Sequence, residues 1–488
     1  MKRICMMLLS MLPMLAMAQT TNEATLNITV ANGGELEQQI KEEDRLKINS
    51  LTISGPLNGK DFKLLQDIVN RSKANEKKGE RLVEVLDLSG VTILEGKEGM
   101  KLKANTLPDN CFAGAKGLVS ITLPSAVVNI SKNCFDGCTK LAVVNYPATV
   151  TTIESGAFKG CESLKTIVLP QNIKEIPSNT FFDCKHLEQI DLPASVTEIG
   201  NSAFENCEAL EAIALNNIKK IGNSAFEDCK KLKEVSLADL SQLGTDAFKD
   251  CTSLTTVSLN GGLTSIGSNA FDGCSQLSDI NIPSSVNQIG TKAFRGCKNL
   301  KSIVLPESLE KIGSHAFEEC SSLRQMLIPS SVRSIGSSAF EECSSIDTVA
   351  IDCMIKAIES DLFRGCSSLR TINLPLTVTK IGDKAFERCI SLTSISMPAA
   401  LKEIEDEAFM GCAMLGSIDL PVSLTDIGSS AFAKCPSLRE VYVKSPNPPS
   451  ISGNTFKGAS CTFWIPNGSK KLYKADKKWT KLSNIKEM

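Results

Sequence analysis

Cysteine and histidine are the residues of this chain whose side chains could do chemistry, and their numbers differ sharply. The 488-residue sequence contains 19 cysteines but only 2 histidines. Cysteine can attack a substrate, bind zinc or form disulfides, but catalytic thiols need a base and zinc sites need clustered ligands. No C-x-x-C pair occurs in the sequence. We therefore predict no catalytic thiol centre, no metal site and no cofactor.

The other signals for catalysis or nucleic-acid binding are also missing. The sequence contains no G-x-x-x-x-G-K-[ST] loop, no H-E-x-x-H motif and no G-x-S-x-G elbow. His186 and His315 have no motif around them and are expected to be surface variants without a catalytic role. The 53 Lys and Arg side chains are balanced by 55 Asp and Glu, so no basic field for nucleic acid exists. We predict that the protein is not an enzyme.

Most of the chain is one repeat, which is marked by phenylalanine. Of the fifteen steps between successive members of the series, twelve span 23 residues, two span 22 and the last spans 24. Fourteen members are followed three residues later by cysteine. A fixed period of this length is typical of a solenoid, in which each repeat forms one coil. The series is Phe112, Phe135, Phe158, Phe181, Phe204, Phe226, Phe248, Phe271, Phe294, Phe317, Phe340, Phe363, Phe386, Phe409, Phe432 and Phe456.

The repeat reads V-x-x-I-G-x-x-A-F-x-x-C-x-x-L-x-x-I-x-L-P, and its parts predict the shape of a coil. The I-x-L alternation indicates a short strand buried on one face, and proline ends it. The spacing of three between Phe, Cys and Leu suits a helical or 3-10 turn. Glycine before this turn, as at Gly200, is expected to permit a tight corner. One coil cannot be stable alone, so the coils must stack, with phenylalanine as a spine.

The fourteen repeated cysteines are predicted to be structural. They occupy one repeat position between apolar neighbours, where cysteine behaves as a small buried residue. Parallel side chains on stacked coils are badly aimed for a disulfide, so we expect most of these thiols to be reduced. Cys111 and Cys134 share a different position, directly before phenylalanine, and a bridge between them stays open.

The I-G-x-x-A-F-x-x-C-x-x-L-x-x-I-x-L-P units from about Leu107 to Val443 resemble the BspA-like leucine-rich repeat family. The resemblance implies an α/β repeat fold, a right-handed leucine-rich-repeat solenoid with parallel strands on one face and short helical or 3-10 segments on the other. It would hold about 15 coils of 23 residues and be capped at both ends. Members of the family are typically exported or surface proteins of host-associated anaerobic bacteria, implicated in adhesion and host-protein binding.

The chain divides into four parts. Residues 1–18 combine Lys2 and Arg3 with an apolar run and an A-x-A site, which predicts a cleaved signal peptide and no membrane span in the mature chain. Residues 19–106 should form an N-terminal cap with irregular opening repeats. Residues 107–444 are the BspA-like repeats, and residues 445–488 a C-terminal repeat and cap, in which a strand is predicted over Thr462–Ile465. The protein is therefore expected at the cell surface, secreted or in the periplasm.

The outer face of the strands is where binding is expected. The residue between Ile and Leu of each strand points outward, and this column is mostly small and polar. A single contiguous stretch of it is apolar, with ordinary surface scatter as the alternative explanation. The candidate partner-binding residues are Asn281, Val304, Leu327, Ala350 and Asn373.

Two functions remain open at this point. The first is an exported, non-enzymatic binding or adhesion protein that presents an extended repeat surface to host or matrix proteins. The second is a structural or glycan-capture scaffold of the bacterial cell envelope. The outward column contains almost none of the Trp, Tyr and Arg anchors that mark a strong protein interface, so no strong contact site is visible in the sequence. Both functions therefore remain open.

Overall fold

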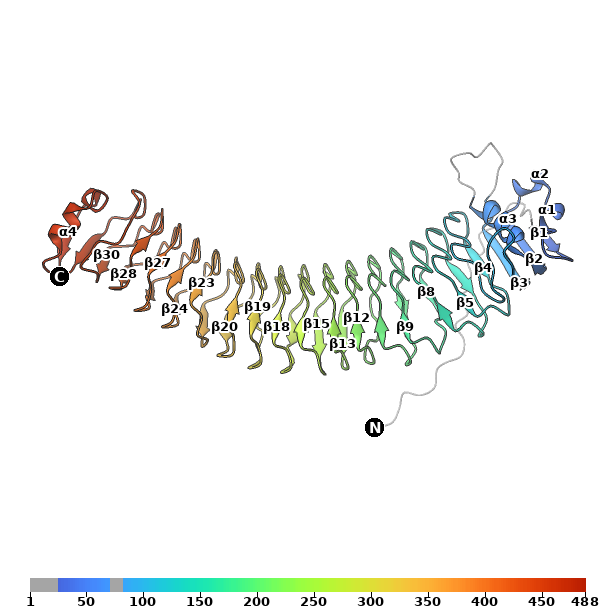
Figure 1. Ribbon diagram of the computed structural model, residues 1–488, viewed down its shortest axis with the longest axis horizontal. Helices are drawn as coiled ribbons and strands as arrows, with labels where there is room; N and C mark the ends of the chain where they lie inside the picture. The colour runs from blue at the N-terminus through green and yellow to red at the C-terminus, as the bar shows by residue number, and fades with distance from the viewer. Residues whose placement is uncertain (1–24, 71–81) are drawn as a thin grey trace.

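The computed structural model describes residues 25–70 and 82–488, and these wind into a stack of coils that curves as an arc (Figure 1). The predicted signal peptide, residues 1–18, lies outside the described residues. The predicted solenoid of stacked parallel strands is confirmed. No helix among the described residues is long and apolar enough to cross a membrane.

The I-x-L segments form the main ladder of parallel strands. Their inward residues are buried and their outward residues mostly exposed, as the alternation predicts. The coils at Ala212 and at Val304 lie in this row without forming a named strand. The strands are β4 (Ser120–Thr122), β6 (Val143–Asn145), β8 (Thr166–Ile167), β10 (Gln189–Ile190), β13 (Glu234–Leu237), β15 (Thr256–Leu259), β17 (Asp279–Asn281), β20 (Gln325–Ile328), β22 (Thr348–Ile351), β24 (Thr371–Asn373), β26 (Ser394–Ser396), β28 (Ser417–Leu420) and β30 (Glu440–Val443).

A second parallel ladder runs along the solenoid, which sequence reasoning did not foresee. It is built from the residue before the repeat glycine position, which is isoleucine in every strand but β14, and from the residue preceding it. Such two-residue strands are too short to show any alternation. They are β5 (Asn129–Ile130), β7 (Thr152–Ile153), β9 (Glu175–Ile176), β11 (Glu198–Ile199), β12 (Lys220–Ile221), β14 (Gln242–Leu243), β16 (Ser265–Ile266), β18 (Gln288–Ile289), β19 (Lys311–Ile312), β21 (Ser334–Ile335), β23 (Ala357–Ile358), β25 (Lys380–Ile381), β27 (Glu403–Ile404) and β29 (Asp426–Ile427).

The segments around phenylalanine are hydrogen-bonded turns rather than the expected helical pieces. Residues 107–444 are all described and contain no helix. In a representative coil the amide of Cys297 donates to the carbonyl of Phe294 over 3.2 Å, and the amide of Leu300 to that of Cys297 over 3.1 Å. The residues two before and two after phenylalanine have positive φ, for example Asn133 at 51° and Gly137 at 72°. Two left-handed residues within five reverse the chain before a regular helix can propagate.

Neighbouring coils are joined through the phenylalanine peptide and ring. The amide of Phe294 donates to the carbonyl of Ala316 in the next coil over 2.8 Å. The carbonyl of Phe294 accepts the thiol of Cys320 over 3.2 Å, and all fourteen repeated cysteines make this bond to the preceding coil. The sixteen rings stack with centroids 5.1–5.7 Å apart and planes within 16°. The predicted spine is therefore continuous from end to end.

The repeat glycine before the turn has a different role from the predicted corner. Gly200, Gly313 and Gly336 do not have positive φ. A Cβ placed on Gly313 would lie 2.5 Å from the backbone of Gly290 and Thr291 in the preceding coil, and one on Gly336 would lie 2.4 Å from the amide nitrogen of Ser314. Glycine is required here because adjacent coils approach too closely for a side chain.

The irregular N-terminal segment continues the same winding. Its strands pair in the order β1-β2-β3-β4-β6, all parallel, so the coils extend beyond the 15 predicted from the regular register. In α3 the Asn58 side chain accepts the amide of Lys60 over 2.9 Å, while Asp61 accepts that of Asn58 over 2.9 Å, which caps the helix. The elements are β1 (Thr25–Thr29), α1 (Leu36–Gln39), α2 (Glu42–Arg45), β2 (Ser50–Leu57), α3 (Gly59–Val69) and β3 (Val85–Ile93).

The C-terminal segment closes the other end of the stack. The strand predicted over Thr462–Ile465 is present as β31, followed by α4 (Lys470–Ala475), the 3-10 helix η2 (Trp479–Lys481) and β32 (Ile485–Glu487). The Tyr473 hydroxyl donates to the carbonyl of Ser445 over 2.7 Å. Phe463 meets the last spine ring, Phe456, edge to face at 4.9 Å, and Trp479 meets Phe463 in the same way at 5.7 Å. Edge-on rings therefore end the stacked spine.

All eighteen described cysteines are free and buried, as predicted for the repeated ones, and Cys111 and Cys134 are free as well. Burial raises the pKa of the repeated thiols, for example Cys161 and Cys251, well above the ordinary range. It raises the pKa of Cys435, near the C-terminal end, to about 11. These thiols stay protonated in the folded chain at pH values where a solvated thiol has ionised.

We expect Gly313→Ala to destabilise the protein by about 1–3 kcal/mol, because the methyl group overlaps the backbone of the preceding coil. Gly416→Ala is the matched control, since its Cβ would meet nothing within 4 Å and its φ is not positive. The control should be neutral or stabilising by about 0.4–1 kcal/mol. Urea unfolding of both variants measures the difference, and equal midpoints would contradict the close-approach explanation.

We also expect the folded protein to lose stability steeply above pH 9. An unfolded thiol releases its proton near pH 8.5, whereas the buried thiols hold theirs to higher pH, so the unfolded state binds fewer protons. The free energy of unfolding then falls by about 1.4 kcal/mol per pH unit for each such thiol. Below pH 8 these thiols contribute no slope. Circular dichroism with urea between pH 7 and 11, in reductant, tests this, and a flat profile from pH 8 to 10 would refute it.

Candidate functional site

The structure places the predicted binding residues along the outward row of the main ladder, but it brings only some of them together. Leu327 on β20 and Ala350 on β22 are register partners, and Asn373 lies on the next strand, β24. Val304 belongs to the coil between β17 and β20, which has no named strand in this row, and it is 82% exposed, against 56% for Leu327. Val304, Leu327 and Ala350 together form the apolar strip, on a sheet whose other face is fully packed.

Asn281 differs from the other four predicted residues because the fold already uses its side chain. Its Oδ1 accepts the amide of Leu259 over 3.0 Å, and its Nδ2 donates to the carbonyl of the same residue over 2.5 Å. The carboxamide thus replaces a ladder hydrogen bond where the strand pairing of β17 ends. Asn281 therefore marks the border of the apolar strip.

A second group of exposed apolar side chains was missed by sequence reasoning. Leu376 and Val422 follow the strand-ending proline of their coils, and they are 79% and 65% exposed. Met354, in the coil before Leu376, is also exposed. Other coils carry Ser125, Ala148 or Gln171 at the position of Leu376. Comparing the residues after proline from coil to coil would have revealed the change.

The outward row ends in an aromatic pair near the C-terminus. Tyr442 on β30 and Trp464 on β31 are register partners, and their rings lie 6.4 Å apart with planes at 11°. Lys444 lies 5.6 Å from the Tyr442 ring and Lys486 5.4 Å from the Trp464 ring. The indole nitrogen of Trp464 donates to Glu440. Sequence reasoning did not include Trp464 in the row, although the T-F-W-I alternation of β31 would have placed it outward.

Away from the main ladder, the position directly after each spine phenylalanine carries a charged side chain from Glu205 to Glu387, and these side chains form a charged row. Several are largely buried, so they must be paired. Arg295 donates to Asp272 with two bonds of 2.8 and 2.7 Å, and Lys249 donates to Glu227 over 2.5 Å. The hydrogen bonds that Arg295 and Lys249 donate to Asp272 and Glu227 raise the pKa values of Arg295 and Lys249.

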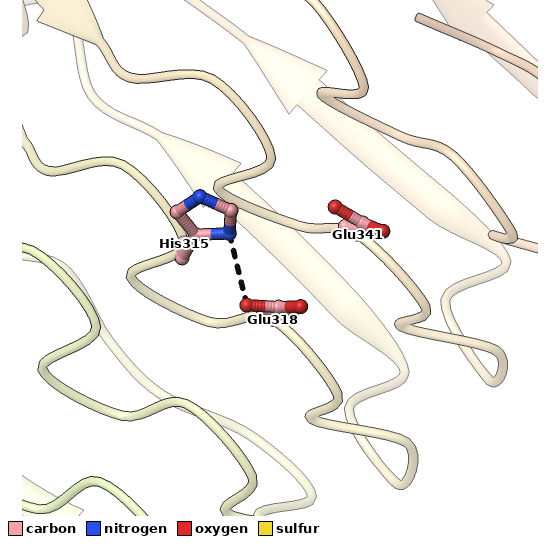
Figure 2. A group of neighbouring side chains, drawn as sticks. All are labelled: His315, Glu318 and Glu341. Carbon is pink, nitrogen blue, oxygen red and sulfur yellow. Dashed lines mark hydrogen bonds and ion pairs between the residues drawn. The ribbon is translucent and has the colours of Figure 1, made fainter. Parts of the chain in front are cut away.

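His315 lies at the surface of the solenoid, beside this charged row. Its Nδ1 is hydrogen-bonded to Glu318 at 2.9 Å, and its side chain is 36% exposed. Figure 2 shows the carboxylate of Glu341, from the next coil, on the same side of His315 as Glu318. Glu341 is buried and paired with Arg364. His186, in contrast, is exposed, and its Nδ1 is hydrogen-bonded to the carbonyl of Glu162 at 2.7 Å.

An open hollow of about 700 Å³ lies on the second ladder near the C-terminal end. Carboxylates dominate its lining, which also includes the ammonium groups of Lys384 and Lys478. The hollow holds no histidine or cysteine, and its walls come from stacked repeats together with Ser450, Ser452 and Lys478 of the C-terminal segment. It offers an acidic groove without a nucleophile–base pair.

Comparison with known proteins agrees with this architecture. The model of the "BspA type Leucine rich repeat region (6 copies)" matches residues 105–233, 219–347 and 334–462. A leucine-rich repeat protein from Bacteroides ovatus is 29% identical, with a TM-score of 0.65 over 76% of this chain and 97% of its own. A leucine rich cell surface protein from Faecalibacterium prausnitzii is 23% identical, with a TM-score of 0.36 over 74% of this chain and 90% of its own.

No curated protein matches the chain significantly. The family model nevertheless covers well over half of the sequence, in the same register as the stacked phenylalanines and thiols. The chain belongs to the BspA-type leucine-rich repeat family.

Proposed function

We propose that this protein is an exported, non-enzymatic binding protein that presents its repeat surface to host or matrix proteins. The observation that carries the proposal is the apolar strip of the main ladder, where Val304 and Leu327 are 82% and 56% exposed. Exposed apolar side chains in a contiguous row are costly to solvate and are typical of contact sites. Leucine-rich repeat solenoids generally bind proteins through such extended surfaces.

The rigidity of the strip supports recognition. Met326 and Ile328 lie beneath Leu327 with 2% and 0% exposure, and β20 pairs with β22 over four residues. A partner that docks here meets a surface whose backbone is already ordered, so little conformational entropy is lost on binding. Export itself is supported by the signal-peptide features of residues 1–18.

A second candidate function is capture of an envelope glycan, and the aromatic pair favours it. The rings of Tyr442 and Trp464 offer apolar surface beside the carboxylate of Asp419 and the ammonium of Lys444. A few polar groups placed around aromatic surface are the usual composition of small-ligand sites. This end of the row would then hold sugar while the rest acts as a scaffold.

The two functions make opposite predictions for two sets of variants. Val304→Asp with Leu327→Asp should lower affinity for a matrix-protein partner at least tenfold, since it places two charges in the contact, whereas Tyr442→Ala should not. Val168→Asp is the matched control, because Val168 is a similarly exposed residue of the same row, 79% exposed, far from the strip. Surface plasmon resonance against purified matrix proteins and a glycan array measures both.

Protein binding that survives the double substitution would exclude the strip as the contact site. Glycan binding that is lost in Tyr442→Ala, with no matrix protein bound by the unmodified chain, would establish the second function in place of the first. Thermal unfolding of each variant checks that the exposed substitutions leave the solenoid intact.

A further inference from the structure

The charged row after phenylalanine alternates in sign except where two carboxylates follow each other. Around the exception the order is Asp272, Arg295, Glu318, Glu341, Arg364 and Glu387, one from each coil. Like charges on adjacent coils repel, and burial strengthens the repulsion. Glu341 is only 6% exposed, and the Glu318 side chain 19%. A cation between Glu318 and Glu341 would restore the alternation.

His315 provides a third ligand at this exception. One atom each of His315, Glu318 and Glu341 lies within 4.8 Å of the others, and Figure 2 shows the three groups facing a common space. Zinc bonds of about 2.0–2.2 Å would bring these atoms to roughly 3.5 Å apart, which requires each side chain to move by about 1 Å. Both glutamates have several rotatable bonds, so this closure needs no change of the backbone.

Arg364 is placed to orient Glu341, one of the three ligands, without binding the ion itself. Its guanidinium pairs with Glu341 and also lies 3.1 Å from Asp361. A carboxylate that ligates a metal through one oxygen commonly accepts a hydrogen bond on the other, which fixes its orientation. The pairing therefore holds Glu341 in place while leaving its second oxygen available.

We propose that His315, Glu318 and Glu341 form a binding site for a divalent zinc-class ion. One imidazole and two carboxylates are a donor set for such ions, and three protein ligands leave at least one coordination position open. The position opens toward solvent, because His315 is 36% exposed. This departs from the sequence-based expectation of no metal site, which rested on the absence of clustered histidine and cysteine motifs.

The solenoid contains an internal control for the proposal. Glu205 and Glu227 form another adjacent carboxylate pair in the same row, and Glu227 pairs with Lys249 as Glu341 pairs with Arg364. The position of His315 is occupied there by Ser202, with φ of 52° against 58° for His315. The two places differ in the imidazole, in the paired cation, and in the step between the glutamates, which is 22 residues at Glu205 and 23 at Glu318.

Equilibrium dialysis of the purified, chelator-treated full chain against ZnCl₂ tests the site. We expect one ion per chain with micromolar affinity, at least a tenfold loss in His315→Ser and Glu318→Gln, and no change in His186→Ser. Serine is native at the His315 position in neighbouring coils, as at Ser338, so His315→Ser should fold normally. Ser202→His should bind a second ion.

Two results would overturn the proposal. The first is that His315→Ser binds zinc as well as the unmodified chain does. Absence of saturable zinc binding by both proteins counts as the same result. The second is a single bound ion in Ser202→His, because the histidine and the carboxylate pair would then be insufficient. Thermal midpoints measured without metal show that each variant is folded before it is compared.

Discussion

The close approach of adjacent coils is the constraint on which the rest of the structure depends. Each coil must meet a near copy of itself along its whole contour, at the spacing of about 5 Å that parallel strands require. The spine rings keep this spacing at 5.1–5.7 Å, and the Phe peptides bond from coil to coil. The residue type at a buried position is therefore determined more by contacts with the two flanking coils than by contacts within its own coil.

This constraint explains why so few residue types fill each inward column. Glycine at Gly313 is needed because the preceding backbone leaves no room for a Cβ. Cysteine at Cys320 is small enough for the interior and still donates to the carbonyl of Phe294, which an alanine could not do. Phenylalanine repeats because offset parallel rings attract each other at this distance. The outward columns face no such requirement, so specific function is confined to them and to the half-buried charged row.

The same logic explains what the sequence could and could not predict. The register of the coils, the position of the strands and the burial of the thiols can each be predicted from a single repeat position compared from coil to coil. For the same reason the sequence alternation placed β31 at its observed bounds. The second ladder was missed because two-residue strands such as β18 carry no alternation. The role of Asn281 and the cluster around His315 depend on contacts between different columns of neighbouring coils. A linear repeat pattern does not contain the offset between such columns, so these contacts could not be predicted from it.

The column that contains His315 shows how a repeat makes exceptions informative. The residues of this column near the site all have a left-handed backbone conformation, which is unfavourable for their residue types. They include Lys292, His315, Ser338 and Lys384. Because the fold demands the backbone shape and accepts such different side chains, it does not select the imidazole. The imidazole beside the Glu318–Glu341 break in charge alternation thus has no structural role that this position has in the neighbouring coils. In a solenoid, a side chain that stacking neither requires nor repeats is the place where a specific function has room to arise.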